Sequence, residues 1–194
     1  MKKIFLFVAI ATVTTLAAFR TLNGEWKNDP TVSQLTFSIN HLGLADVSGT
    51  FNDFQVSLNS TKEDFSDASF SLSAKISSID TRIEQRDTHL KSPDFFDAEK
   101  YPALTFQSTS IKAAGKNKYK LTGNLTIHGV TKAVTLDLFY KGIAENPMNK
   151  KQTAGFQVIG TIKRSDFKIG EKFPAPMLSD EVKIKADGEF AAND

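Results

Sequence analysis

The sequence predicts an all-β fold. Three observations lead to that prediction: apolar and polar residues alternate along most of the chain, glycine, asparagine and proline separate the alternating stretches, and one internal segment departs from the alternation. The 194 residues, of which 40% are hydrophobic, fit one domain with a sizeable core. Because the chain has no cysteine, disulfides, thiolate nucleophiles and zinc–thiolate sites are excluded.

The N-terminus has the order of a secretory signal peptide. A pair of lysines precedes an apolar run, residues 4–13, and small residues follow it. Because the run is shorter than the ~20 apolar residues of a membrane-spanning helix, we expect residues 1–18 to be a cleaved signal peptide. Residues 19–194 would then form a single domain of a periplasmic or secreted protein. Without the two lysines, 22 basic residues face 22 acidic ones, which gives a nucleic-acid partner no electrostatic support.

Strands are assigned in chain order from the alternation. The stretch QLTFSINH places Leu35, Phe37 and Ile39 on one face. The apolar parity then changes at residues 52–53, which predicts a β-bulge within one long strand that spans residues 47–58. The other expected strands lie within residues 70–76, 104–106, 119–127, 134–140, 156–162 and 182–190.

One segment, residues 81–92, lacks alternation and has good helix formers ahead of Pro93, which predicts a short helix or ordered loop near residues 82–97. Elsewhere, strands joined by short turns favour an antiparallel meander. We expect about eight such strands to close into a barrel, because closure removes the exposed edges of an open sheet. Its interior would either fill with side chains or hold one slender ligand, and a two-sheet sandwich is the alternative architecture.

No motif in the sequence predicts catalysis. The three histidines, His41, His89 and His128, lie on separate segments without a metal-binding spacing, no serine lies in Gly-x-Ser-x-Gly, and no glycine loop resembles a phosphate cradle. We therefore expect neither an enzyme nor a metal site. Phenylalanine is abundant, with 16 residues against 3 tyrosines and 1 tryptophan. Composition alone favours a filled apolar core over a ligand cavity.

Four long motifs together resemble the YceI family of lipocalin-like bacterial proteins. They are LTFSINHLGLADVSGTFNDF (residues 35–54), RDTHLKSPDFFDAEKYPALTFQSTS (86–110), LTGNLTIHGVTKAVTL (121–136) and IKRSDFKIG (162–170). The resemblance covers nearly the whole mature chain, but Val32 stands where the family often has histidine, and Lys168 where glycine is usual. It implies an extended antiparallel eight-stranded barrel whose lumen holds a polyisoprenoid or similar lipid, and so favours a hollow barrel over the sandwich and the filled core.

The function implied by the resemblance is non-catalytic binding or carriage of a long apolar lipid, such as a polyisoprenoid or an isoprenoid quinone, in the bacterial envelope. We expect no cofactor other than the bound lipid, and transient contact with a membrane; the resemblance also suggests a homodimer. The expected wall of the lumen consists of apolar residues with one parity: Leu35, Phe37, Ile39, Phe70, Leu72, Phe106, Leu121, Leu125, Phe156, Val158 and Ile162.

A second group of residues is expected at the mouth of the barrel, in or near the segments without strand alternation. An arginine there would fork onto a phosphate head group, while aspartates orient the cations. Bracing one end of the barrel is the more common role for such a mixture of charged and aromatic residues, and we favour it. The mouth candidates are His41, Arg86, Asp87, His89, Lys91, Arg164 and Asp166.

Two other classes of function stay open on the sequence. An envelope enzyme that acts on a lipid-like substrate requires a polar cluster inside the lumen, for example His41 together with carboxylates. A structural or stress-related envelope protein requires a filled interior and an exposed apolar patch. The volume of the lumen separates a carrier from a structural protein, because ligand pockets typically measure about 300 to 1,000 Å³.

Overall fold

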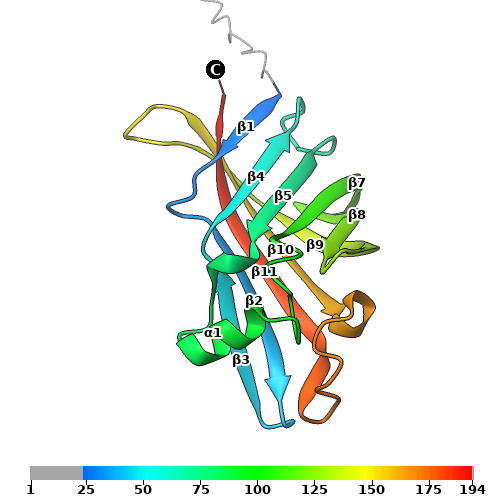
Figure 1. Cartoon of the computed structure of the whole chain (residues 1–194). Helices are drawn as coiled ribbons and strands as arrows, with labels where there is room; N and C mark the ends of the chain where they lie inside the picture. The colour runs from blue at the N-terminus through cyan, green and yellow to red at the C-terminus, as the bar shows by residue number, and fades with distance from the viewer. Residues whose placement is uncertain (1–23, 194) are drawn as a thin grey trace, which may run out of the picture.

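Residues 24–193 form an antiparallel β-barrel with one short α-helix at its side (Figure 1). The computed structural model describes residues 24–193, and the expected signal peptide, residues 1–18, lies outside them. The strands are β1 (Glu25–Asn28), β2 (Gln34–His41), β3 (Ala45–Phe51), β4 (Phe54–Asn59), β5 (Ser69–Lys75), β6 (Ile79–Asp80), β7 (Ala103–Gly115), β8 (Lys118–Ile127), β9 (Val130–Glu145), β10 (Gln152–Lys163) and β11 (Leu178–Ala192). The helices are α1 (Glu84–Lys91) and the 3₁₀ helices η1 (Ile76–Ser78) and η2 (Arg164–Phe167).

Eight strands form the closed ring of the barrel. Neighbours pair in the order β1–β4–β5–β7–β8–β9–β10–β11, and β1 also pairs with β11, which closes the ring. The strands β2, β3 and β6 extend the barrel toward the lower end in Figure 1: β2 pairs with β11 beyond β1, β3 pairs with β2, and β6 pairs with β3. The predicted eight-stranded antiparallel barrel is confirmed, and the sandwich is excluded.

The expected irregularity at residues 52–53 is present as a two-residue break between β3 and β4 rather than as a single-residue bulge. Within the break, the main-chain N–H of Asn52 donates to the carbonyl of Ser78 (3.1 Å). Phe51 and Phe54 both face the interior, although they are an odd number of residues apart. Because side chains alternate between the faces of a strand, only an irregularity allows this.

The segment that was expected to form a helix or an ordered loop contains α1, which contacts β6. Its position is fixed by Asp87, whose carboxylate accepts hydrogen bonds from the main-chain N–H (2.8 Å) and the hydroxyl (2.5 Å) of Thr81. Because β6 pairs with β3 and β7 pairs with β5 and β8, α1 and the segment after it connect the lower extension of the sheet to the closed ring. In the part of the chain that the structure describes, no helix is long and apolar enough to cross a membrane.

Aromatic side chains fill the upper end of the barrel, near β1 and β4. Phe65, in the loop between β4 and β5, is fully buried, and its ring centroid lies 5.0 Å from those of Trp26, Tyr140 and Phe156. Sequence analysis missed β1, which brings Trp26 into this cluster, because four residues are too few to show alternation. We call this end of the barrel the closed end.

Asp67 holds the loop that places Phe65 in the closed end. Burial raises the pKa of Asp67, but hydrogen bonds from Ser60, Thr61 and Lys62 lower it more strongly, from 3.8 to about 2. Because the folded pKa is lowered, the stabilisation is complete above pH 3.8 and is lost as the pH falls through about 2. Since Asp67 is exposed, solvent screening limits it to about 1 kcal/mol.

We therefore expect Asp67→Asn to lower the free energy of unfolding by about 1 kcal/mol at neutral pH. Urea unfolding of both proteins as a function of pH is the measurement. The difference should shrink as the pH falls from 3.8 through about 2. A difference that stays constant over this range would show that the carboxylate charge is not what stabilises the loop.

Lys168 ends η2 in the left-handed conformation, with φ 58° and ψ 33°. A side chain in this conformation costs roughly 1 kcal/mol relative to glycine. We expect Lys168→Gly to raise the free energy of unfolding by about 1 kcal/mol, measured by urea unfolding. Lys163→Gly is the matched control, because Lys163 is extended and glycine there should lower stability. If both variants lose stability, the conformation of Lys168 is not the source of strain.

Candidate functional site

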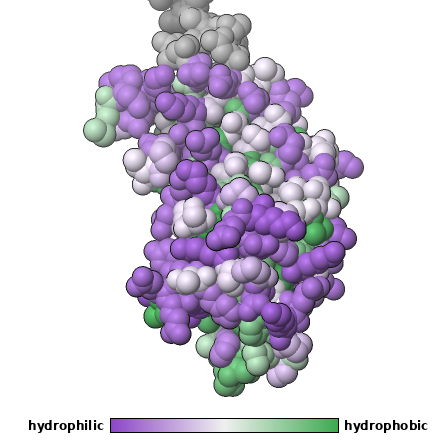
Figure 2. Space-filling model, in the orientation of Figure 1, coloured by the Kyte–Doolittle hydropathy of each residue, from purple (hydrophilic) through white to green (hydrophobic). Residues whose placement is uncertain are grey.

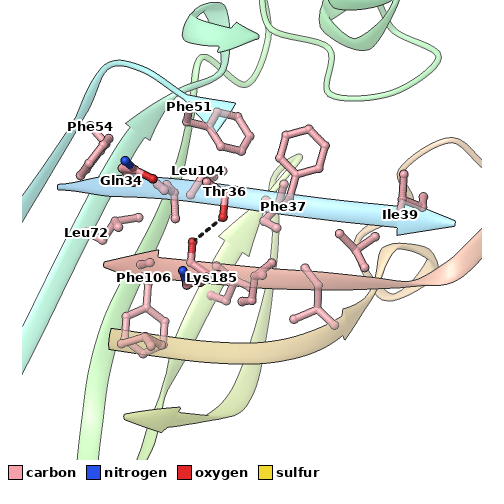
Figure 3. Close-up of a pocket in the computed structure, with 18 of the residues that line it drawn as sticks. Gln34, Thr36, Phe37, Ile39, Phe51, Phe54, Leu72, Leu104, Phe106 and Lys185 are labelled. Atoms are coloured by element: carbon pink, nitrogen blue, oxygen red, sulfur yellow. Dashed lines mark hydrogen bonds between the residues drawn. The ribbon is translucent and has the colours of Figure 1, made fainter. Parts of the chain in front are cut away.

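A cavity of about 520 Å³ occupies the interior of the barrel below the closed end, and almost all of its wall is apolar. Every one of the eleven residues expected to form the lumen wall lines it. Their contact with a lipid stays a prediction. Figure 3 shows one part of the wall, in which residues from five strands surround the same space: Phe37, Ile39, Phe51, Phe54, Leu72 and Phe106.

Two glycines allow large phenylalanines to lie against the barrel wall. A Cβ atom at Gly49 would come within 2.5 Å of the ring of Phe37, and one at Gly123 within 2.4 Å of the ring of Phe106. Each ring therefore packs on the backbone of the adjacent strand, in the space that the side chain of any residue other than glycine at position 49 or 123 would fill. This packing leaves space in the lumen even though the strands have bulky inward residues.

The cavity extends to the lower end of the barrel, because His41 at the end of β2 and Met177 of the loop before β11 line it. Lining residues next to the closed end, such as Phe70 and Phe156, are buried. At the other end, the lining residues His41, His89 and Met177 are exposed to solvent. We call this end the mouth. Gln34 and Lys185, on the paired strands β2 and β11, also line the cavity and are exposed. The interior is therefore not solid, and aromatic residues close it at the upper end.

Several wall residues were absent from the expected set. The wall also contains aromatic residues from β3 and β4 and aliphatic residues from β7, β9 and β11, and the segment after α1 contributes two more phenylalanines. The inward parity of β11 was visible in the sequence, but the residues after α1 gave no periodic signal. The additional large residues include Phe51, Phe54, Phe95, Phe96, Leu104, Leu136, Val182 and Ile184.

Arg86 lies at the mouth and lines the cavity. Its Nε donates to the hydroxyl of Thr81 (2.7 Å), and its Nη2 donates to the carbonyl of the same residue (2.8 Å). Within residues 24–193, its Nη1 makes no hydrogen bond, so the guanidinium of this cavity-lining residue retains free donors. Asp87, in contrast, is engaged with Thr81 and does not line the cavity.

Arg164 was a head-group candidate, but its contacts are those of a bracing residue. Its side chain is buried, with 7% exposure, and donates through Nε, Nη1 and Nη2 to main-chain carbonyls of the segment that follows η2. Because all five N–H groups have a carbonyl partner, none is left for a phosphate. The five acceptors are the carbonyls of Ile169, Gly170, Phe173, Leu178 and Ser179.

Two segments meet across one side of the mouth. Phe95, after α1, stacks on Phe173 of the loop before β11, with centroids 5.0 Å apart and planes 11° apart. Asp94 accepts from Lys172 of the same loop (2.5 Å) and interacts with His89 (3.3 Å). The hydrogen bond from Lys172, followed by that from His89, lowers the pKa of Asp94. Of the remaining mouth candidates, Lys91 and Asp166 do not line the cavity.

The three histidines do not form one site. His41 and His89 lie at the mouth, whereas His128 interacts through Nδ1 with the carbonyl of Phe167 (3.3 Å) and packs on Tyr101, with centroids 4.8 Å apart. Among residues 24–193, no group of three histidine, aspartate or glutamate side chains is arranged to hold a metal ion. Of the mouth candidates, Arg86, Asp87 and Arg164 thus hold main-chain segments, and His89 contacts Asp94.

Comparison with known proteins identifies similar chains over most of the length. A family profile described as a YceI-like domain matches residues 26–190. A UPF0312 protein of Staphylococcus aureus strain N315 is 36% identical over 166 residues, which is 84% of this chain and 94% of that protein. The crystal structure of a Campylobacter jejuni YCEI protein is 34% identical, with a TM-score of 0.72, and the match covers 80% of this chain and 91% of that one.

A more distant structure shares the fold. It is a polyisoprenoid binding domain from Saccharophagus degradans, implicated in plant cell wall breakdown. It is 16% identical, with a TM-score of 0.66, and the match covers 88% of this chain and 99% of that one. At this identity the similarity shows a common barrel architecture.

Proposed function

Because this chain belongs to the YceI-like domain family, we propose that it binds a long apolar amphiphile, such as a polyisoprenoid, in the barrel lumen without transforming it. The observation that carries the proposal is the apolar cavity that is closed at one end and open at the other. Its volume of about 520 Å³ lies within the usual range of ligand pockets, about 300 to 1,000 Å³. A polyisoprenoid is also what the Saccharophagus degradans domain with the same fold is named for binding.

The energetics decide which part of the ligand gives selectivity. Burying an apolar chain contributes about 0.8 kcal/mol per carbon, so three isoprene units would supply on the order of 12 kcal/mol relative to water. The isoprenoid starts in a bilayer, however, and the bilayer interior is as apolar as the lumen. The free energy of transfer between them is therefore close to zero. Cavity shape and the polar head of the ligand must therefore provide the selectivity.

We place the head group at the mouth, beside Arg86. Its free guanidinium edge suits a phosphate or another acceptor, while Arg164 has no donor left for that role. A signal-like N-terminus supports action in the envelope, and a homodimer stays a prediction. We propose no catalytic step, since the mouth candidates Asp87 and Arg164 bind main-chain groups rather than converge on a reaction centre.

Lipid extraction and mass spectrometry of the protein purified from its native envelope test the proposal. We expect one class of long-chain amphiphile to co-purify in near-stoichiometric amount. Titration with fluorescent polyprenyl and fatty-acid probes gives a second readout that needs no native ligand. Absence of any co-purified amphiphile, together with no uptake of either probe, would refute the binding function.

A further inference from the structure

The mouth end of the barrel has an exposed apolar tip made of two adjacent turns. The β2–β3 turn exposes Leu42 and Leu44, at 49% and 85%, and the loop before β11 exposes Met177, at 46%. The main-chain N–H of Leu42 donates to the carbonyl of Met177 (3.1 Å), which joins the two turns. Figure 2 shows hydrophobic surface at the lowest point of the molecule, over the β2–β3 turn. We call these three residues the apolar tip.

Neither turn has a permanent charge. They read HLGLA and FPAPMLS. The first charged residue after the β2–β3 turn, Asp46, pairs with Lys183 (3.2 Å), and Lys172, which precedes the other turn, pairs with Asp94 (2.5 Å). Asp180, which follows the second turn, accepts hydrogen bonds from the main-chain N–H (2.9 Å) and the hydroxyl (2.8 Å) of Ser165. Because burying an unpaired charge is costly, the absence of charge from the turns themselves lowers the barrier to placing the tip in an apolar layer.

The β2–β3 turn also departs from local backbone preference. Leu42 and Gly43 have φ values of 57° and 71°, and the N–H of Leu44 donates to the carbonyl of His41 (3.0 Å). These are the φ values of the two central residues of a type I′ turn, which prefers asparagine or aspartate followed by glycine, and the turn lies within a three-residue loop because His41 pairs with Ala45. Leucine at position 42 is unfavourable because its backbone has a positive φ and because its apolar side chain is exposed to water. Such a conflict indicates that the side chain meets an apolar partner.

The apolar tip is continuous with the cavity, because Met177 belongs to both and His41, next to Leu42, lines the mouth. We propose that the apolar tip inserts into the membrane interface, so that the lumen exchanges its ligand directly with the bilayer. The inference rests on the proposed lipid-binding function and names the surface and the partner. A mouth embedded among lipid head groups would let a long apolar chain cross without passing through water.

The absence of cysteine allows a direct test with one fluorescent label. Leu44→Cys, labelled with an environment-sensitive NBD group, is mixed with vesicles of phosphatidylcholine, alone or with phosphatidylglycerol. The matched control is Met148→Cys, because Met148 is 94% exposed at the β9–β10 turn, at the other end of the barrel. We expect a blue shift and a rise in emission at position 44 only. No change at position 44, or the same change at both positions, would overturn the proposal.

Transfer kinetics separate this inference from the binding function. In Leu42→Asn/Leu44→Asn, position 42 gains a residue that the turn prefers and position 44, which is 85% exposed, becomes polar, so the fold should be about as stable. Uptake of a fluorescent polyprenyl probe from vesicles, in contrast, should slow about tenfold or more. Binding of a short-chain probe from solution should not change. If the double variant takes up the probe from vesicles at the normal rate, the apolar tip does not load the lumen. If no variant binds any probe, the binding function itself fails.

A second copy of the chain is the competing occupant of the apolar tip. Sedimentation at increasing protein concentration would reveal it. A dimer that the double variant abolishes, with no response of the label to vesicles, would overturn membrane insertion and assign the tip to self-association.

Discussion

Leu72→Glu is expected to lower the affinity for a long-chain apolar probe by at least about 30-fold. Leu72 lines the cavity from β5, where it is paired with Phe106 of β7. A carboxylate at this position loses its hydration when an apolar chain enters the lumen, and that desolvation costs about 2 kcal/mol or more. A cost of this size corresponds to about 30-fold in the dissociation constant. Fluorescence titration with a polyprenyl probe measures it.

Ser73→Glu is the matched control, because Ser73 is the next residue on the same strand and is exposed on the outer face. It introduces the same charge without placing it in the lumen, so affinity should stay within about twofold. Far-ultraviolet circular dichroism and thermal unfolding of both variants show whether the barrel is intact. If folded Leu72→Glu binds the probe as tightly as the unchanged protein, the ligand does not occupy this cavity.

The wall of the cavity was accessible to sequence reasoning because a strand repeats every two residues. Once one face of a strand is known to be inward, as for Leu35 and Phe37 on β2, every second residue follows it. Closure into a barrel was also predictable, since it removes exposed strand edges. The hollow interior could not be predicted from composition, which favoured a filled core. The expectation of a hollow barrel came from the resemblance to the YceI family.

A physical signal for the hollow interior was nevertheless present in the sequence. Gly49 and Gly123 occupy inward positions of β3 and β8, and the structure shows why: the rings of Phe37 and Phe106 lie on them. Glycine at inward positions of a phenylalanine-rich barrel places aromatic rings against the wall. The partner of each glycine, however, depends on strand pairing, which alternation alone does not give.

The role of Arg164 shows where sequence reasoning reaches its limit. A cation after a strand, next to Ser165 and Asp166, looks like a surface residue at a barrel mouth. Whether its donors face a ligand or the main chain depends on the path of residues 169–177, an irregular loop without periodicity, and on where β11 begins after it. The same limit applies to Arg86. Its partner Thr81 binds the Nε and Nη2 edge of the guanidinium and leaves Nη1 without a hydrogen bond, which the sequence does not reveal.

Arg164→Met is expected to lower the free energy of unfolding by about 3 kcal/mol or more. The variant keeps much of the side-chain volume but leaves five main-chain carbonyls without the donor that now joins them. An unpaired buried polar group costs about 1 to 3 kcal/mol, although some of the five carbonyls will turn to water. Urea unfolding measures the loss. Hydrogen exchange should also become faster in residues 169–177, the loop that contacts Phe95 at the mouth, and at the start of β11.

Two further variants determine whether the five hydrogen bonds of the Arg164 guanidinium are responsible for the stability that Arg164→Met loses. Arg164→Lys keeps the charge but has three donors rather than five, so its stability should lie between those of the unchanged protein and Arg164→Met. Lys163→Met removes an adjacent exposed cation and should change stability by no more than about 0.5 kcal/mol. If Arg164→Lys is as stable as the unchanged protein, charge rather than the fivefold contact would hold the loop. Such a result would return Arg164 to the candidates for head-group binding, because its donors would then be dispensable for the fold.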